Sequence, residues 1–206
     1  MTNNQNPEEP GVAGSASPAE LDRMDFDLTD GTMVVFSDCH YRPDEAPSTA
    51  HRALISMLPE LRPAVVACGG DAMDLPKISK HARIGWEPTI KPADERENAV
   101  ERMAEVEQAA PDAALFWAIG NHDVRWDQAL SAQAGDFEGV PGFCLADHFP
   151  SWSMGWSLWL NGDGDDPVCL KHRWAGGALA ARNNVIKGGA SIITVRIPTK
   201  SAGHSD

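Results

Sequence analysis

The chain has little cysteine, few basic residues and no long apolar stretch. Its four cysteines, Cys39, Cys68, Cys144 and Cys169, stand singly, and no two of them have the C-x-x-C spacing. This usage favours reduced thiols in the cytoplasm over a disulfide framework. No apolar run reaches the roughly 20 residues that a membrane span requires. We therefore expect a cytoplasmic protein without a membrane partner.

Basic residues are outnumbered by acidic ones. The chain has 17 Lys and Arg against 30 Asp and Glu, which gives a formal net charge of −13. Such a surface opposes non-specific binding to duplex nucleic acid, because that binding depends on neutralising phosphates. A phosphate substrate is still compatible with this charge, since bound divalent ions reverse the local potential.

The first 28 residues lack an apolar period. They are rich in Asn, Pro, Ser and acidic residues, without the basic start and apolar stretch of a signal peptide. We therefore expect a disordered acidic leader over residues 1–28. The 206 residues are enough for one domain with a core, which we place over 29–194, and an atypical tail over 195–206.

Three apolar runs are present, and a polar cluster follows each of them. Residues 34–36, 64–68 and 114–119 have the length and the β-branched or aromatic content of buried strands. In open α/β sheets, ligands gather just beyond the carboxyl ends of the strands. Helical patterns over residues 48–63 and 92–108 alternate with these runs, which favours a layered α/β domain.

The polar clusters contain hard oxygen and imidazole donors. They are Ser37-Asp38-Cys39-His40, Gly69-Gly70-Asp71-Ala72-Met73-Asp74 and Gly120-Asn121-His122-Asp123. Glycines ahead of the donors permit sharp turns and close backbone approach. Carboxylate, amide and imidazole groups together suit divalent metals. Two such ions roughly 3.5–4 Å apart acidify a bridging water and clamp a phosphoryl group, which is what phosphate-ester hydrolysis needs at neutral pH.

The order D-x-H, G-D-x-x-D and G-N-H-D resembles the calcineurin-like metallophosphoesterases over residues 32–194. Residues 79–86 resemble a segment that is common in phage-type members of this family. The resemblance implies a layered fold of β-sheets flanked by helices. It also implies hydrolysis of a phosphomonoester or phosphodiester by attack of a hydroxide that bridges two divalent ions. The ions would be manganese, iron, zinc or magnesium, and mixed nitrogen and oxygen ligation favours the transition ions. The substrate would be a phosphate ester such as a nucleotide or a nucleic acid.

The resemblance assigns a metal role to four residues of the clusters. Asp38 and His40 would bind the first ion, and Asp71 would bridge both ions. Asn121 would bind the second ion.

The resemblance gives three further residues a place in the site. His122 would face the scissile phosphate and aid the leaving group, held by a carboxylate such as Asp74. A strand over residues 168–171 would end at His172, where the family has a lone histidine that binds the second ion. The alternative for His172 is a surface histidine in a basic loop.

The resemblance fails near the carboxyl end. The family closes its site with G-H-x-H after a strand like residues 190–194, whereas here the nearest match is Gly203-His204-Ser205-Asp206, which lacks the second histidine. A frayed tail is the preferred interpretation of that match. We therefore expect an incomplete carboxyl-terminal part and one imidazole fewer at each ion. Reading residues 195–202 one base earlier permits a closer match, which would indicate a frameshifted or truncated gene.

This departure supports an alternative function from another class. The chain would then be a truncated, catalytically weak or inactive relative that acts as a non-enzymatic binding module.

Three other segments also carry expectations about local structure. Residues 79–86 would form a basic, aromatic wall beside the site or a solvated loop, residues 152–160 alternate like one strand, and residues 178–187 fit a further helix.

Overall fold

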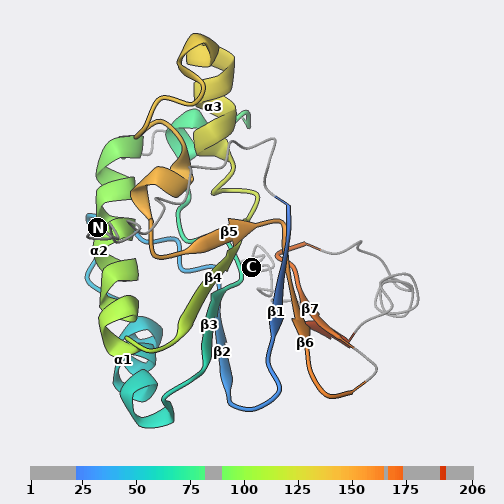
Figure 1. Ribbon diagram of the computed structural model, residues 1–206. Coiled ribbons are helices and arrows are strands. Elements are labelled where there is room, and N and C mark those ends of the chain that lie inside the picture. Colours follow the sequence, from blue (N-terminus) through green and yellow to red (C-terminus); the bar gives the residue numbers. More distant parts are fainter. Residues whose placement is uncertain (1–21, 82–89, 165–166, 174–190, 194–206) are drawn as a thin grey trace, which may run out of the picture.

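Two sheets and a layer of helices make up the described part of the chain. This computed structural model describes residues 22–81, 90–164, 167–173 and 191–193. The fold is mixed α/β, with parallel strands in both sheets and helices flanking one of them (Figure 1). In chain order the elements are β1 (Arg23–Asp27), β2 (Met33–Phe36), α1 (Thr49–Leu61), β3 (Val65–Cys68), η2 (Pro76–Ile78), α2 (Pro92–Ala109), β4 (Ala114–Ala118), α3 (Arg125–Ala134), η3 (Gly135–Phe137), η4 (Leu145–His148), β5 (Ser153–Gly155), β6 (Ser157–Asn161), β7 (Val168–Leu170) and β8 (Ser191–Ile193).

The sheet beside the helices has the strand order β2-β3-β4-β5, and all its neighbouring strands are parallel. In its register Val34 of β2 pairs with Val66 of β3, which pairs with Leu115 of β4. Helices α1 and α2 cover one side of this sheet (Figure 1). Because parallel strands run in one direction, the carboxyl ends of β2, β3 and β4 meet at a single edge.

The second sheet lies on the other side of the first and has the order β1-β6-β7-β8 (Figure 1). Its β6–β7 pair is antiparallel, while β1–β6 and β7–β8 are parallel. The carboxyl end of β7 leads directly to Lys171 and His172.

The first sheet is buried on both faces, which explains the continuous apolar runs of β3 and β4. Val66 belongs to the apolar cluster that contains Leu58 of α1 and Met103 of α2. Its neighbour Val65 belongs to the cluster that contains Leu158 of β6. Both valines are fully buried. Successive side chains of a strand point to opposite faces, so β3 fills the core on the helix side and the core between the sheets.

The two predicted helices form where their end signals lie. The hydroxyl of Ser48 accepts a 3.1 Å hydrogen bond from the amide of His51 and caps α1. Helix α1 ends at Leu61, and the residue that caps it, Arg62, has a left-handed φ of 47° directly before Pro63. Helix α2 begins with Pro92 in its first turn. Both helices therefore begin at local sequence signals, although α1 also continues through Pro59.

Two expectations from the sequence are wrong. The leader was expected to reach residue 28, yet Arg23–Asp27 form β1 and pair with β6. Charged and apolar residues alternate along β1, which places Met24 and Phe26 on one face. That face packs against the core between the sheets, which a disordered leader would not do. The single strand expected over residues 152–160 is two strands in different sheets, β5 and β6, separated by Trp156, which is 43% exposed.

Several expectations lie outside the described residues. They concern residues 1–21 of the leader, residues 82–86 of the basic segment, the helix over 178–187 and the tail over 195–206. Residues 191–193 form β8, within the run expected to be a strand. None of the described helices is long and apolar enough to cross a membrane.

Candidate metal centre

The three polar clusters meet at the carboxyl edge of the first sheet. The loops after β2 and β3 are joined through their backbones, because the amide of Asp38 donates to Gly70 at 2.8 Å and the amide of His40 donates to Asp71 at 3.1 Å. The loop after β4 joins them through its own amide, since His122 N donates to Asp71 Oδ1 at 2.8 Å. These bonds fix the relative positions of the expected ligands.

Three of the expected ligand residues hold an unusual backbone conformation. The φ angles of Asp38, His40 and Asp71 are 53°, 44° and 54°, all in the left-handed region. Non-glycine residues there cost on the order of 1–3 kcal/mol each, and such residues concentrate at functional sites. Backbone strain at these three donor residues therefore indicates a functional site, where the position of the side chains matters more than the stability of the loops.

Two glycines make room for the donors. A Cβ atom on Gly70, whose φ is 98°, would lie 2.7 Å from both Gly120 N and His172 Nδ1. A Cβ atom on Gly120 would overlap Asp71. The G-D and G-N sequences are therefore required by close packing between the loops after β3 and β4.

Asp71 lies at the centre of the site and is only 4% exposed. Its Oδ2 atom is 3.1 Å from His172 Nε2 and 3.9 Å from His122 Nε2. Burial alone would raise the pKa of Asp71, but hydrogen bonds from the His172 ring and the His122 amide outweigh burial and lower it. Asp71 therefore stays an anion, as a metal-bridging carboxylate must.

His172 lies in the site and not on the surface. Its Nδ1 atom is 2.8 Å from the carbonyl oxygen of Gly69, which can only accept, so Nδ1 carries the donated proton. That bond leaves Nε2 directed at Asp71. Metal-binding histidines almost always donate their other ring N–H in this way. The arrangement fits the expected ligand role and disagrees with a surface histidine in a basic loop.

Among the residues that the structure describes, two groups of donors are close enough to hold a metal ion. One consists of Asp38, His40 and Asp71, and the other of His40, Asp74 and His122, with the ligand atoms of each group within 4.8 Å of one another. His40 is common to both groups. The first group contains the residues expected at the first ion, whereas the second includes His122, which was expected to face the substrate.

His122 and Asp74 form a close pair. His122 Nδ1 is 2.6 Å from Asp74 Oδ1 and 3.1 Å from the Asp74 carbonyl oxygen. This contact lowers the pKa of Asp74. Burial opposes the charged imidazolium, yet the bond to Asp74 and the charge of Asp71 outweigh burial and raise the pKa of His122. With Nδ1 bound to Asp74, Nε2 is the nitrogen that remains for a substrate.

Asn121 takes no part in these contacts. It is partly exposed between Gly120 and His122, and within the described ranges no hydrogen bond involves its side chain. Its position in the loop after β4 is the expected one, and its metal role stays a prediction.

Asp123 belongs to the third polar cluster, but its sequence context assigns it no role, and the structure gives it one. It is fully buried, and its carboxylate accepts hydrogen bonds from the amides of Asp71 at 2.8 Å, Gly120 at 3.0 Å and Met73 at 3.3 Å. It also accepts a bond from the indole of Trp117 at 3.0 Å. Burial raises the pKa of Asp123. One side chain thus joins the loops after β3 and β4 behind the candidate metal ligands.

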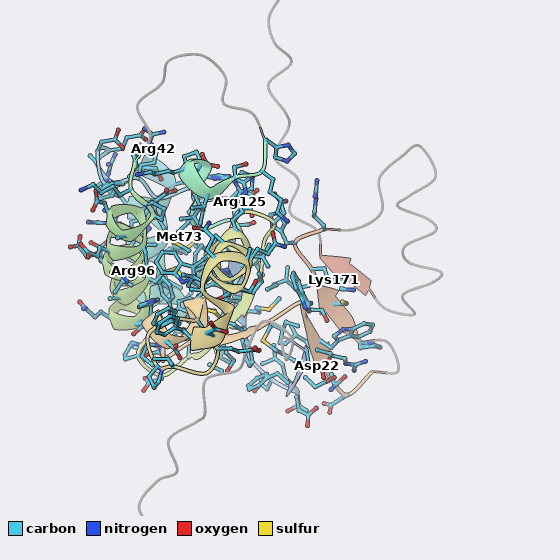
Figure 2. The ribbon with its side chains drawn as sticks, turned by 90° about the horizontal axis from the view of Figure 1, so that it is seen from above. Asp22, Arg42, Met73, Arg96, Arg125 and Lys171 are labelled. Carbon is cyan, nitrogen blue, oxygen red and sulfur yellow. The ribbon has the colours of Figure 1, made fainter. Side chains whose placement is uncertain are left out.

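Arg125, the first residue of α3, was also missed. Its Nη1 atom donates to the Asp74 carbonyl oxygen at 2.5 Å, and its Nη2 atom is 3.4 Å from His122 Nε2. In Figure 2, Arg125 lies between the helical layer that carries Arg96 and the strands that lead to Lys171. A cation therefore lies beside the nitrogen that would face a substrate.

No protein-family model, curated protein or solved structure matches this chain.

Proposed function

We propose that the chain is a dinuclear metal-dependent hydrolase of phosphate esters, of the calcineurin-like metallophosphoesterase type. The observation that carries this proposal is the meeting of Asp38, His40 and Asp71 beside His172, with the His122–Asp74 pair on the same edge of the sheet. These residues come from four separate loops, and carboxylate and imidazole donors at a strand edge suit divalent transition ions.

The donors divide into two sets that share one carboxylate. Asp38, His40 and Asp71 would hold the first ion, and Asp71 would hold the second together with Asn121 and His172. This division agrees with two features of the site. The pKa of Asp71 is lowered, and the bond from His172 Nδ1 to Gly69 leaves Nε2 of His172 pointing at Asp71. When bound, the ions supply an activated water and positive charge at the phosphoryl group.

The other residues would serve the leaving group and the substrate. His122 Nε2 would donate a proton to the departing oxygen, while Asp74 orients the ring through Nδ1. Arg125 adds a positive charge beside the same nitrogen. We propose a phosphomonoester or phosphodiester as the substrate. We also propose the cytoplasm as the compartment, since all four cysteines are free thiols.

The test is metal analysis combined with an ester assay. The chain, first cleared with a chelator, is titrated with manganese and assayed with bis-p-nitrophenyl phosphate and p-nitrophenyl phosphate. We expect two ions per chain and metal-dependent turnover of at least one ester. Asp71→Asn should abolish turnover while circular dichroism stays unchanged, because the two ions would lose the charge that they share.

Two outcomes would contradict the proposal in different ways. Metal binding without turnover of either ester would favour the non-enzymatic binding module. Near-normal turnover and metal content in Asp71→Asn would mean that the division of ligands is wrong.

A further inference from the structure

Glu95 is a buried acid close to the site that none of the roles above requires. It lies in the first turn of α2 and is 1% exposed. Its Oε1 atom accepts hydrogen bonds from the amide of Asp74 at 2.6 Å and from the amide of Leu75 at 2.8 Å. Its Oε2 atom is buried without a partner among the described residues. Both bonds thus go to the loop that carries Asp74.

This placement is costly for Glu95. A buried carboxylate with an unpaired oxygen loses hydration, and burial raises the pKa of Glu95. Acidic side chains in the first turn of a helix usually stabilise it from the surface, where the cost is small. By contrast, Glu101 on the same helix has a side chain that is 69% exposed and keeps its hydration.

The loop that Glu95 holds is itself strained. Leu75 has a left-handed φ of 50°, although it is neither glycine nor asparagine. It also precedes Pro76, and the residue before a proline favours extended conformations. The two bonds to Glu95 oppose relaxation of this segment, because relaxation would leave the buried Oε1 atom unpaired as well.

The same segment determines where His122 points. Asp74 contacts His122 Nδ1 through its carboxylate at 2.6 Å and its carbonyl oxygen at 3.1 Å. Both atoms belong to the residue whose amide Glu95 holds. A shift of the Asp74 backbone would therefore move both partners of the imidazole at once.

We propose that Glu95 is a positioning residue that fixes the backbone of Asp74 and thereby the orientation of the His122 ring. This inference rests on the proposed function for its kinetic consequence, but the orientation itself can be measured without turnover. The competing interpretation is that Glu95 only stabilises the fold at the start of α2.

The variants separate these interpretations. Glu95→Ala removes both bonds to the loop, whereas Glu95→Gln keeps an oxygen that can accept them. Glu95→Asp keeps the charge but withdraws the carboxylate by one methylene. Glu101→Ala is the matched control, because this exposed acid lies on the same helix and, within the described part of the chain, makes only a 3.5 Å ion pair with Arg102.

The kinetic measurement compares a phenyl and a p-nitrophenyl ester of the class that the wild type hydrolyses. The phenyl ester has the poorer leaving group and depends more on proton donation by His122. Misplacement by about 1 Å can cost roughly 100-fold. We expect Glu95→Ala to lower kcat for the phenyl ester roughly 10- to 100-fold more than for the nitrophenyl ester, with little change in KM. Glu95→Gln should recover most of this loss.

The structural measurement uses the nitrogen resonances of the His122 ring in the full chain. We expect a protonated Nδ1 bound to Asp74 in the wild type, Glu95→Gln and Glu101→Ala, and loss of this signature in Glu95→Ala. If Glu95→Ala does not fold, Glu95→Asp should show the same loss.

Equal loss of kcat on both esters, a glutamine variant as poor as the alanine variant, or an unchanged His122 signature in Glu95→Ala or Glu95→Asp would overturn the proposal. A metal-loaded wild type that hydrolyses neither ester would instead contradict the proposed function, and the His122 signature would still decide the role of Glu95.

Discussion

The Nε2 atom of His172 lies 3.1 Å from Oδ2 of Asp71, across the space between the two sheets' strand ends. The contact joins the loop after β7 to the loop after β3, so the second sheet contributes a donor to the edge of the first. Burial would lower the pKa of His172, but the bond to Asp71 outweighs burial and raises it. The two side chains are therefore close enough to form an ion pair, and the proposed function assigns both of them to the second ion.

His172→Ala tests the share of this histidine in metal binding. We expect the chain to lose one of two manganese ions, or to bind it at least about tenfold more weakly, because even an outer-shell partner is worth about that much. Isothermal titration measures both stoichiometry and affinity. Glu101→Ala is the control, since the side chain of Glu101 on α2 is 69% exposed. Unchanged titration of His172→Ala would make His172 a structural partner of Asp71.

His122→Ala distinguishes the two groups of possible metal ligands. If His122 donates a proton to the leaving group, turnover should fall roughly 10²–10⁴-fold, as for a positioned acid or base. Metal stoichiometry should stay unchanged, because Asp38, His40 and Asp71 remain. Loss of an ion in this variant would instead indicate that the group of His40, Asp74 and His122 holds the metal.

The described site could largely be anticipated from local sequence. Asp38 and Asp71 follow apolar runs of strand length, and parallel pairing of β2 with β3 brings them to one edge. Glycine at 70 and 120 indicated close approach, and any Cβ there would clash. His172 was harder to place, because its position depends on the second sheet lying against the first.

The missed residues carry little local signal. Asp123 reads as one more polar residue of its cluster, and only the folded chain shows its bonds to three amides and Trp117. In the sequence, Glu95 is explained by the common preference for acids in the first turn of a helix. Nothing in that local pattern indicates its bonds to the loop of Asp74. Helix α3 was missed because it buries Asp127, a polar residue on the face where apolar ones are expected.

Strand β1 could have been found. Residues 23–27 alternate charged and apolar side chains, and Met24 and Phe26 face the core between the sheets. The acidic composition of the surrounding segment favours a leader, whereas the period-two pattern favours a strand. Pairing with β6 buries the apolar face of this pattern, so the strand forms.

Asp123→Ala should destabilise the fold without removing a direct metal contact. Four N–H donors would lose their acceptor in a buried place, and each unsatisfied group costs about 1–3 kcal/mol before relaxation and water entry. We expect the free energy of unfolding to fall by roughly 2–4 kcal/mol, measured by urea denaturation. Asp112→Ala, in the exposed turn before β4, is the control. A variant as stable as this control would show that the four bonds add nothing net.

The pH dependence of stability should reveal Asp127, which is 7% exposed on α3. Burial raises the pKa of Asp127, although the amide of Leu145 donates to its Oδ1 at 3.0 Å. The folded state therefore holds this proton to a higher pH than the unfolded state does. It follows that Asp127 contributes stability below its unfolded pKa of about 4, and that this contribution is lost as pH rises through the folded pKa.

Asp127→Asn keeps an oxygen for the Leu145 amide and cannot ionise. Relative to the wild type, it should therefore gain free energy of unfolding as pH rises above the unfolded pKa of about 4 and the wild-type carboxyl ionises. Urea denaturation of both chains across this rise in pH isolates Asp127, because Asp71 and Asp74 titrate in both. Their lowered pKa values act in the opposite direction, stabilising the fold as pH rises. A stability difference that stays constant with pH would contradict this prediction. It would mean that hydration or the hydrogen bond from the Leu145 amide offsets the cost of burying the ionised Asp127 carboxylate.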